Sequence, residues 1–138
     1  MEYALKTEKA FSEPKIFKVV TMVALGLEQA HHQGILHKQI SSTLVQMADQ
    51  NAAVSARLSN FAIATIAEKQ KADEAFYTSP EVAARRTPYN AKAEVWALGV
   101  LLLEMIQPSL KPKEGQTPVS AEQVRVEELE KLSRHLSR

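Results

Sequence analysis

The segment from Ala91 to Ile106 constrains the fold of this chain more than any other part of the sequence. Its side chains are apolar on nearly every helical face from Val95 to Met105. A helix without a continuous polar face has to be buried on most of its sides. The longest apolar run inside it, residues 97–103, is far shorter than the ~20 residues needed to cross a bilayer. The segment is therefore predicted to be the central helix of a globular core.

A second helix and a small β-hairpin are predicted before this segment. Apolar residues recur every three or four positions between Ser12, the expected N-cap, and Gly34, which follows the last periodic residue. Residues 42–47 and 53–58 are short, partly β-branched runs. Residues 49–51 separate the two runs and are typical of a turn, so the runs predict a hairpin.

The remaining segments give weaker patterns. Residues 62–78 fit either a solvated helix or a loop. Proline and glycine punctuate residues 108–119, which predicts a linker, and a capping box at Ser120 opens a predicted amphipathic helix over residues 120–138. The thin apolar stripe of that helix fits packing on the domain's own surface or an intermolecular contact, and both interpretations stay open.

Composition narrows the function classes. A chain of 138 residues fits one small domain, and its net charge of +1, without a basic block, gives no sign of nucleic-acid binding. The sequence has no cysteine, so disulfides and thiolate metal sites are excluded. Residues 1–6 lack the pattern of a secretory signal. We therefore expect a cytoplasmic protein with no membrane partner.

Four short motifs occur in an order that is hard to obtain by chance. They are Gly34-Ile35-Leu36-His37, Asn60-Phe61-Ala62, Ser79-Pro80-Glu81 and Trp96-Ala97-Leu98-Gly99. In this order they resemble the C-lobe of eukaryotic protein kinases, and the residues around the last motif are similar to those of NIMA-related kinases. The resemblance covers residues 1–107. It implies a mainly α fold, namely a partial kinase-like C-lobe with a small β-hairpin, truncated after the central helix.

The positions that carry kinase chemistry depart from the family pattern. The resemblance places Gln39 where the catalytic Asp stands, Ser41 where a Lys stands, Leu44 where a metal-binding Asn stands and Asn60 where the metal-binding Asp stands. An amide has negligible basicity, and a leucine offers magnesium no oxygen. We therefore expect no catalytic residue, and these four are degenerate equivalents only.

The resemblance assigns structural roles to a second set of residues. His37 and Phe61 are expected to stack. Glu94 stands in place of an Asp that holds the catalytic-loop backbone, and its longer side chain is expected either to loosen that bond or to shift the loop. Glu81 would need a cationic partner, and the Arg85-Arg86 pair fits either that role or contact with an acidic partner. The full structural set is His37, Phe61, Glu81, Glu94, Trp96, Leu101 and Met105.

These expectations lead to one functional hypothesis and its rivals. The chain begins at the position of the hinge between the lobes and has no Gly-rich phosphate loop, so we expect no nucleotide-binding N-lobe, no cofactor and no metal. The leading hypothesis is a catalytically inactive pseudokinase, not an enzyme, that binds proteins as a scaffold or regulator. An active kinase and a cytoskeletal protein are the candidate partners, the latter implying cytoskeletal association. The rivals are a kinase homologue retaining weak ATP binding or residual phosphotransfer, and a decayed fragment.

Overall fold

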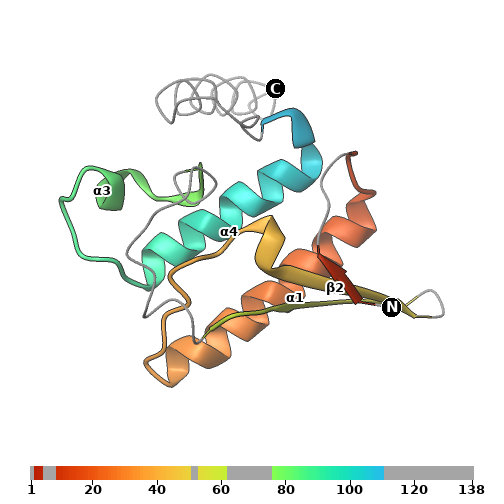
Figure 1. Cartoon of the computed structure of the whole chain (residues 1–138), viewed down its shortest axis with the longest axis horizontal. Helices are drawn as coiled ribbons and strands as arrows, with labels where there is room; N and C mark the ends of the chain where they lie inside the picture. Colours follow the sequence, from red (N-terminus) through yellow and green to blue (C-terminus); the bar gives the residue numbers. More distant parts are fainter. Residues whose placement is uncertain (1, 5–8, 51–52, 62–75, 111–138) are drawn as a thin grey trace.

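The computed structural model describes residues 2–4, 9–50, 53–61 and 76–110. Within these residues the fold is mainly helical, with one small antiparallel sheet (Figure 1). The mainly α character with a small sheet agrees with the sequence-based expectation.

Helix α1 (Glu13–His32) forms where the periodic pattern predicts it. Its buried residues, Ile16, Val19, Val23 and Leu27, are spaced by three and four, so they form one apolar stripe. The helix ends at His32, and Gly34, just past its C-cap Gln33, has a φ of 72°, in the left-handed region that glycine adopts without steric cost.

Helix α4 (Ala91–Ile106) also has the predicted bounds. It runs antiparallel to α1, since the amide of Phe11 donates to the carbonyl of Met105 at one end and His31 meets Glu94 at the other (Figure 1). The expected burial on most sides is only partly observed. Leu101 and Met105 are fully buried, whereas Val95 is 64% exposed.

The sheet contains one strand that the sequence pattern did not reveal. Strands β2 (Val45–Gln50) and β3 (Ala53–Leu58) form the expected hairpin, and β1 (Glu2–Ala4) pairs antiparallel with the other side of β2. A three-residue edge strand is too short to show an alternating pattern.

The hairpin differs from the expectation in its bounds. Residues Ser42–Leu44 form a short 3-10 helix, η1, so the strand starts later than predicted. Asp49 and Gln50, expected in the turn, belong to the strand because the register pairs Gln50 with Ala53. Cross-strand pairing therefore overrides the local turn preference of these residues.

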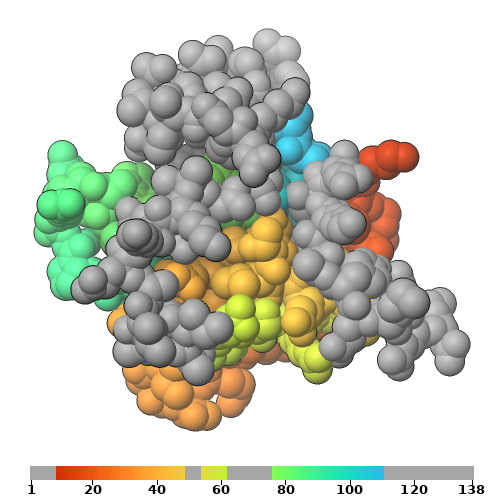
Figure 2. Space-filling model, in the orientation of Figure 1, coloured from red at the N-terminus to blue at the C-terminus, as the bar shows by residue number. Residues whose placement is uncertain are grey.

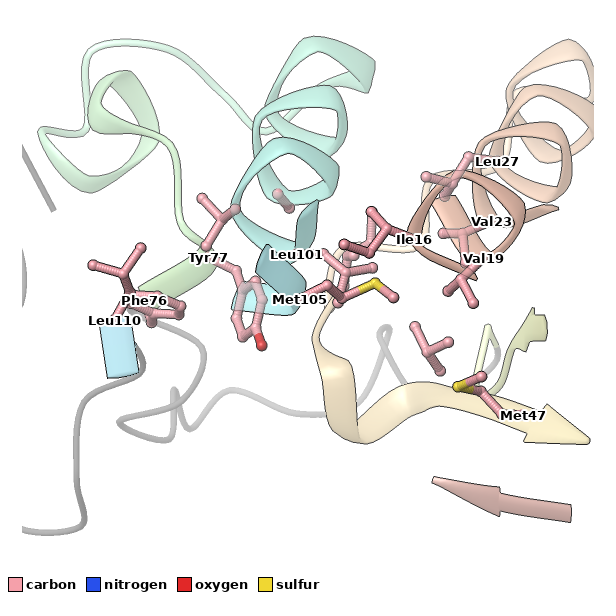
Figure 3. Close-up of a cluster of buried hydrophobic side chains, with 14 residues drawn as sticks. Ile16, Val19, Val23, Leu27, Met47, Phe76, Tyr77, Leu101, Met105 and Leu110 are labelled. Atoms are coloured by element: carbon pink, nitrogen blue, oxygen red, sulfur yellow. The ribbon is translucent and has the colours of Figure 1, made fainter. Parts of the chain in front are cut away.

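The core lies where α1, α4 and the sheet meet (Figure 3). Val19 and Val23 come from α1, Met47 from β2, and Leu101 and Met105 from α4. Burying each such side chain contributes roughly 1.5–3 kcal/mol, so contacts between elements hold the fold together.

Two short elements complete the described fold. Helix α3 (Pro80–Ala83) lies on the loop that leads to α4, and the 3-10 helix η3 (Pro108–Leu110) follows α4. Leu110 is buried in the core, so the start of the predicted linker packs on the domain. The rest of that linker and the predicted helix over 120–138 lie outside the described residues. Among the helices that are described, none is long and apolar enough to cross a membrane.

Candidate functional site

Glu94 is the centre of the candidate site. Its side chain is fully buried at the start of α4, and one carboxylate oxygen accepts a 2.7 Å hydrogen bond from the backbone amide of Lys38. The other oxygen lies 2.6 Å from Nε2 of His31, at the end of α1. The expected loosening of the bond to the loop is therefore not observed. The longer side chain of Glu94 reaches both partners, and a buried carboxylate requires such donors.

A tyrosine adds a third donor to this carboxylate. Tyr89 stands just before α4, and its hydroxyl forms a hydrogen bond to Glu94. Burial first, then the negative charge of Glu94 and this hydrogen bond, raise the pKa of Tyr89 above its ordinary value. Glu94 therefore ties three segments together: the end of α1, the loop at residue 38 and the entry to α4.

The backbone of the loop is strained where Glu94 holds it. Lys38 has a φ of 65°, a left-handed conformation that costs a non-glycine residue about 1–2 kcal/mol. Asn60 has a φ of 69°, which asparagine tolerates better than most residues. The hydrogen bond from the Lys38 amide to Glu94 offsets part of the strain at Lys38.

The rings of His37 and Phe61 are in contact. The His37 side chain is fully buried, and its ring packs edge-on against Phe61 with 4.6 Å between centroids. Nε2 of His37 lies 2.9 Å from the carbonyl oxygen of Ser59. The amide and hydroxyl of Ser59 both donate to the carbonyl of Leu44. The structure therefore joins the loop of residues 37–44 to residues 59–61.

The four positions expected to be degenerate lie along these two segments. Ser41 is buried and its hydroxyl is 2.8 Å from that of Thr43, while Gln39 and Leu44 are half-buried. Asn60 is exposed at the end of the hairpin. Leu44 and Asn60 are brought near each other through Ser59. All four side chains are uncharged, and the described residues contain no cluster of His, Asp or Glu that could hold a metal ion.

Sequence reasoning missed a second buried carboxylate. Glu104 is fully buried in α4, where it accepts hydrogen bonds from the hydroxyls of Ser42, at 2.8 Å, and Tyr77. The Tyr77 hydroxyl also accepts from the amide of Ser42. Burial, and then the charge of Glu104 and the hydrogen bond to it, raise the pKa of Tyr77. A glutamate inside an apolar helical run was the available signal, because a carboxylate there needs donors from elsewhere in the fold.

The remaining predicted residues fall into two groups. Leu101 and Met105 are fully buried, and Trp96 is half-buried. Glu81 is half-buried in α3, and within the described part of the chain no ion pair joins it to Arg85 or Arg86.

An open groove lies between α1 and α4. Its volume is about 720 Å³, and its apolar lining includes Phe17, Leu25, Val95 and Leu98. Three of these side chains remain more than half exposed: Phe17 at 66%, Val95 at 64% and Leu25 at 54%. His31, the partner of Glu94, also lines the groove. The groove therefore borders the buried carboxylate that holds the loop.

Comparison with known proteins places these features in a family. A model of the protein kinase domain family matches residues 1–136. Serine/threonine-protein kinase Nek5 of Mus musculus is 35% identical over 101 residues, covering 69% of this chain and 16% of that protein. Nek5 of Homo sapiens is 32% identical over 101 residues, covering 69% and 14%. Serine/threonine-protein kinase STY46 of Arabidopsis thaliana is 29% identical over 125 residues, covering 87% and 21%.

These comparisons confirm one expectation and overturn another. The two Nek5 proteins bear out the resemblance to NIMA-related kinases. The expectation that the chain is not an enzyme is wrong, because the relatives are named serine/threonine-protein kinases, a class of enzymes. The chain spans about a fifth or less of the length of the three relatives described above. Since the family model matches nearly the whole sequence, this chain belongs to the protein kinase family.

Proposed function

We propose that residues 1–107 form a C-lobe unit of a serine/threonine-type protein kinase domain and that this unit acts as a protein-binding or regulatory module. The C-lobe assignment is supported by the contact between the loop of residues 37–44 and Glu94, and by the packing of His37 on Phe61. Both contacts join motifs that the resemblance places in one lobe. The partner is a protein, with an active kinase and a cytoskeletal protein as candidates.

The groove between α1 and α4 is the observation that carries this proposal. Single exposed apolar residues are common on protein surfaces, but contiguous apolar patches usually mark interaction sites. Here Phe17, Leu25 and Val95 are exposed around one hollow of about 720 Å³. A partner that covers them would remove apolar surface from water, which favours binding by about 25 cal/mol per Å² of apolar surface buried.

Co-purification from native cells tests this function. The double variant Leu25→Asp, Val95→Asp places charges in the groove at exposed positions, so the fold should persist. Ser109→Asp, an exposed position after the far end of α4, is the matched control. We expect proteins that co-purify with the wild type and the control to be lost with the groove variant at unchanged circular dichroism. Equal recovery with all three proteins would contradict the proposal.

Phosphoryl transfer is a second candidate function, because the relatives are named serine/threonine-protein kinases. It requires nucleotide held together with magnesium. Titration of a fluorescent ATP analogue, with and without magnesium, measures this directly. Saturable and magnesium-dependent binding, followed by transfer of radiolabel to a protein substrate, would favour this function. Loss of phosphoryl transfer in the Gln39→Ala variant would show that the loop of residues 37–44 carries this activity.

A further inference from the structure

Three serine or threonine residues in the chain precede a proline: Ser79, Thr87 and Thr117. In the structure, the first two differ in solvent exposure. Ser79 is fully buried, so an enzyme cannot reach its hydroxyl in the folded protein, whereas Thr87 is exposed. Thr117 lies outside the described residues. Within the described part of the chain, Thr87 is therefore the accessible Ser/Thr-Pro site.

The loop that carries Thr87 presents it away from the core. Residues 84–90 connect α3 to α4 and form the left-hand edge of the molecule (Figures 1 and 2). Residues 83–88 are all exposed, and Thr87 itself is outside any helix or strand. Pro88 lacks an amide hydrogen and favours an extended backbone at Thr87. An exposed threonine followed directly by proline is the pattern on which a proline-directed kinase acts.

Two cations next to Thr87 are available for a phosphate. Arg85 and Arg86 are exposed, and in the described structure neither guanidinium takes part in an ion pair. Arg85 has a φ of 53°, and the Arg86 amide donates to the carbonyl of Glu81, so both residues belong to the turn that ends α3. Guanidinium groups bind phosphate oxygens through charge-assisted, often bidentate hydrogen bonds.

The same loop leads directly into the candidate site. Asn90 accepts hydrogen bonds from the amides of Lys92 and Ala93 and so caps α4, whose positive end favours nearby negative charge. Tyr89, two residues after Thr87, donates to Glu94, which holds the Lys38 amide. A phosphate on Thr87 would therefore stand three residues before the N-cap of α4 and two residues before Tyr89, which bonds to Glu94.

We propose that Thr87 is a phosphorylation site for a proline-directed serine/threonine kinase acting in trans, with Arg85 and Arg86 receiving the phosphate. In this step the γ-phosphoryl group of ATP moves to Oγ1 of Thr87. An O–P bond forms there, the bond between the γ-phosphorus and the β,γ-bridging oxygen breaks, and ADP leaves with that electron pair. The hydroxyl proton passes to the base of the modifying kinase. The product carries about two negative charges near neutral pH.

Mass spectrometry of the folded chain tests the site. The protein, as wild type, Thr87→Ala, Pro88→Ala and Thr117→Ala, is incubated with magnesium ATP and a proline-directed kinase. We expect phosphate on Thr87 in the wild type and in Thr117→Ala, none on residue 87 of Thr87→Ala, and about tenfold slower labelling in Pro88→Ala, as loss of 1.4 kcal/mol of recognition would give. Ser79 should stay unmodified in the folded protein.

A peptide control tests whether the kinase recognises the sequence around Thr87, and a stability measurement tests the role of the two arginines. A synthetic peptide of residues 83–91 should be labelled by the same enzyme, and labelling of the peptide but not of the folded chain would overturn the proposal. Phosphorylation should raise the Tm of the wild type by about 2–4 °C. The rise should disappear in the Arg85→Ala, Arg86→Ala double variant. An equal rise in that variant would overturn the role of the two arginines.

Discussion

Two glutamates on one helix are fully buried. Glu94 and Glu104 both lie on α4, in a segment that is otherwise mostly apolar. Each carboxylate is satisfied by donors from other segments: Lys38 and His31 for Glu94, Ser42 and Tyr77 for Glu104. The two residues therefore act as polar links that position the loop of residues 37–44 against α4.

Removing the Glu94 carboxylate should destabilise the fold. Glu94→Ala leaves the Lys38 amide and the His31 ring without their partner, and breaking a buried charged contact costs about 3 kcal/mol. Urea unfolding followed by circular dichroism measures this loss. Glu28→Ala is the control, because Glu28 is exposed and lies 4.0 Å from His32, a surface pair worth at most about 0.5 kcal/mol. Equal losses in the two variants would contradict the central role of Glu94.

Tyr77 should make the protein sensitive to alkali. Its pKa is raised above the ordinary value near 10, so the unfolded chain loses this proton at a lower pH than the folded protein does. The contribution of Tyr77 is complete below about pH 10 and is lost as the pH rises further, with a slope of about 1.4 kcal/mol per pH unit. Urea unfolding between pH 8 and roughly 11 measures that slope.

The matching variant is Tyr77→Phe. It should reduce the alkaline slope by that same ~1.4 kcal/mol per unit, since phenylalanine has no proton to lose. At neutral pH it should also cost about 1–3 kcal/mol, because Glu104 loses one of its donors. An unchanged slope in the variant would show that Tyr77 ionises equally in both states.

At the scale of elements, the two long helices begin in different ways. The side chain of Asn90 accepts from two amides at the start of α4, whereas Ser12, at the corresponding position of α1, makes no side-chain capping bond. The start of α4 thus depends on a side chain. The start of α1 is closed by backbone bonds from Lys15 and Ile16 to the carbonyl of Ser12.

Asn90→Ala should therefore destabilise the protein by about 1 kcal/mol, the typical value of a lost N-cap. Ser12→Ala should change the free energy of unfolding by much less, because it removes no capping bond. Thermal unfolding of both variants in parallel gives the comparison. A larger loss of unfolding free energy in Ser12→Ala than in Asn90→Ala would contradict the conclusion that only the start of α4 depends on a side-chain cap.

The elements differ in how well the sequence predicts them. The bounds of α4 and the end of α1 just before Gly34 follow from periodicity and end signals, which are local properties. Strand β1 and the 3-10 helix at Ser42–Leu44 cannot be predicted from such local patterns. The first exists because its backbone pairs with β2. At the second, the Ser42 amide and hydroxyl bond to Tyr77 and Glu104, which lie far along the chain.

At the scale of the whole molecule, one core joins the helices and the sheet. Leu101 is fully buried within the cluster that also contains Val19 of α1 and Met47 of β2. Because α1, α4 and the hairpin all contribute to this cluster, they should lose their structure together rather than one at a time.

Leu101→Ala should lower the free energy of unfolding by about 2–5 kcal/mol through the lost burial and the cavity that remains. The exposed neighbour Val95→Ala should change it by no more than about 0.5 kcal/mol. Circular dichroism and the fluorescence of Trp96, the sole tryptophan, should report the same midpoint for each protein. Separate midpoints would indicate that the helices and the sheet unfold independently.

The sequence by itself determined the two long helices, the hairpin and the family, because helical periodicity, turn residues and ordered motifs are readable along the chain. It also singled out Glu94, His37 and Phe61. Only the tertiary structure decided which donors Glu94 and Glu104 receive, since His31 and Ser42 lie 63 and 62 positions away from them. It likewise decided that Ser79 is buried and Thr87 exposed. Burial and pairing depend on which distant segments meet, and no local pattern encodes that meeting.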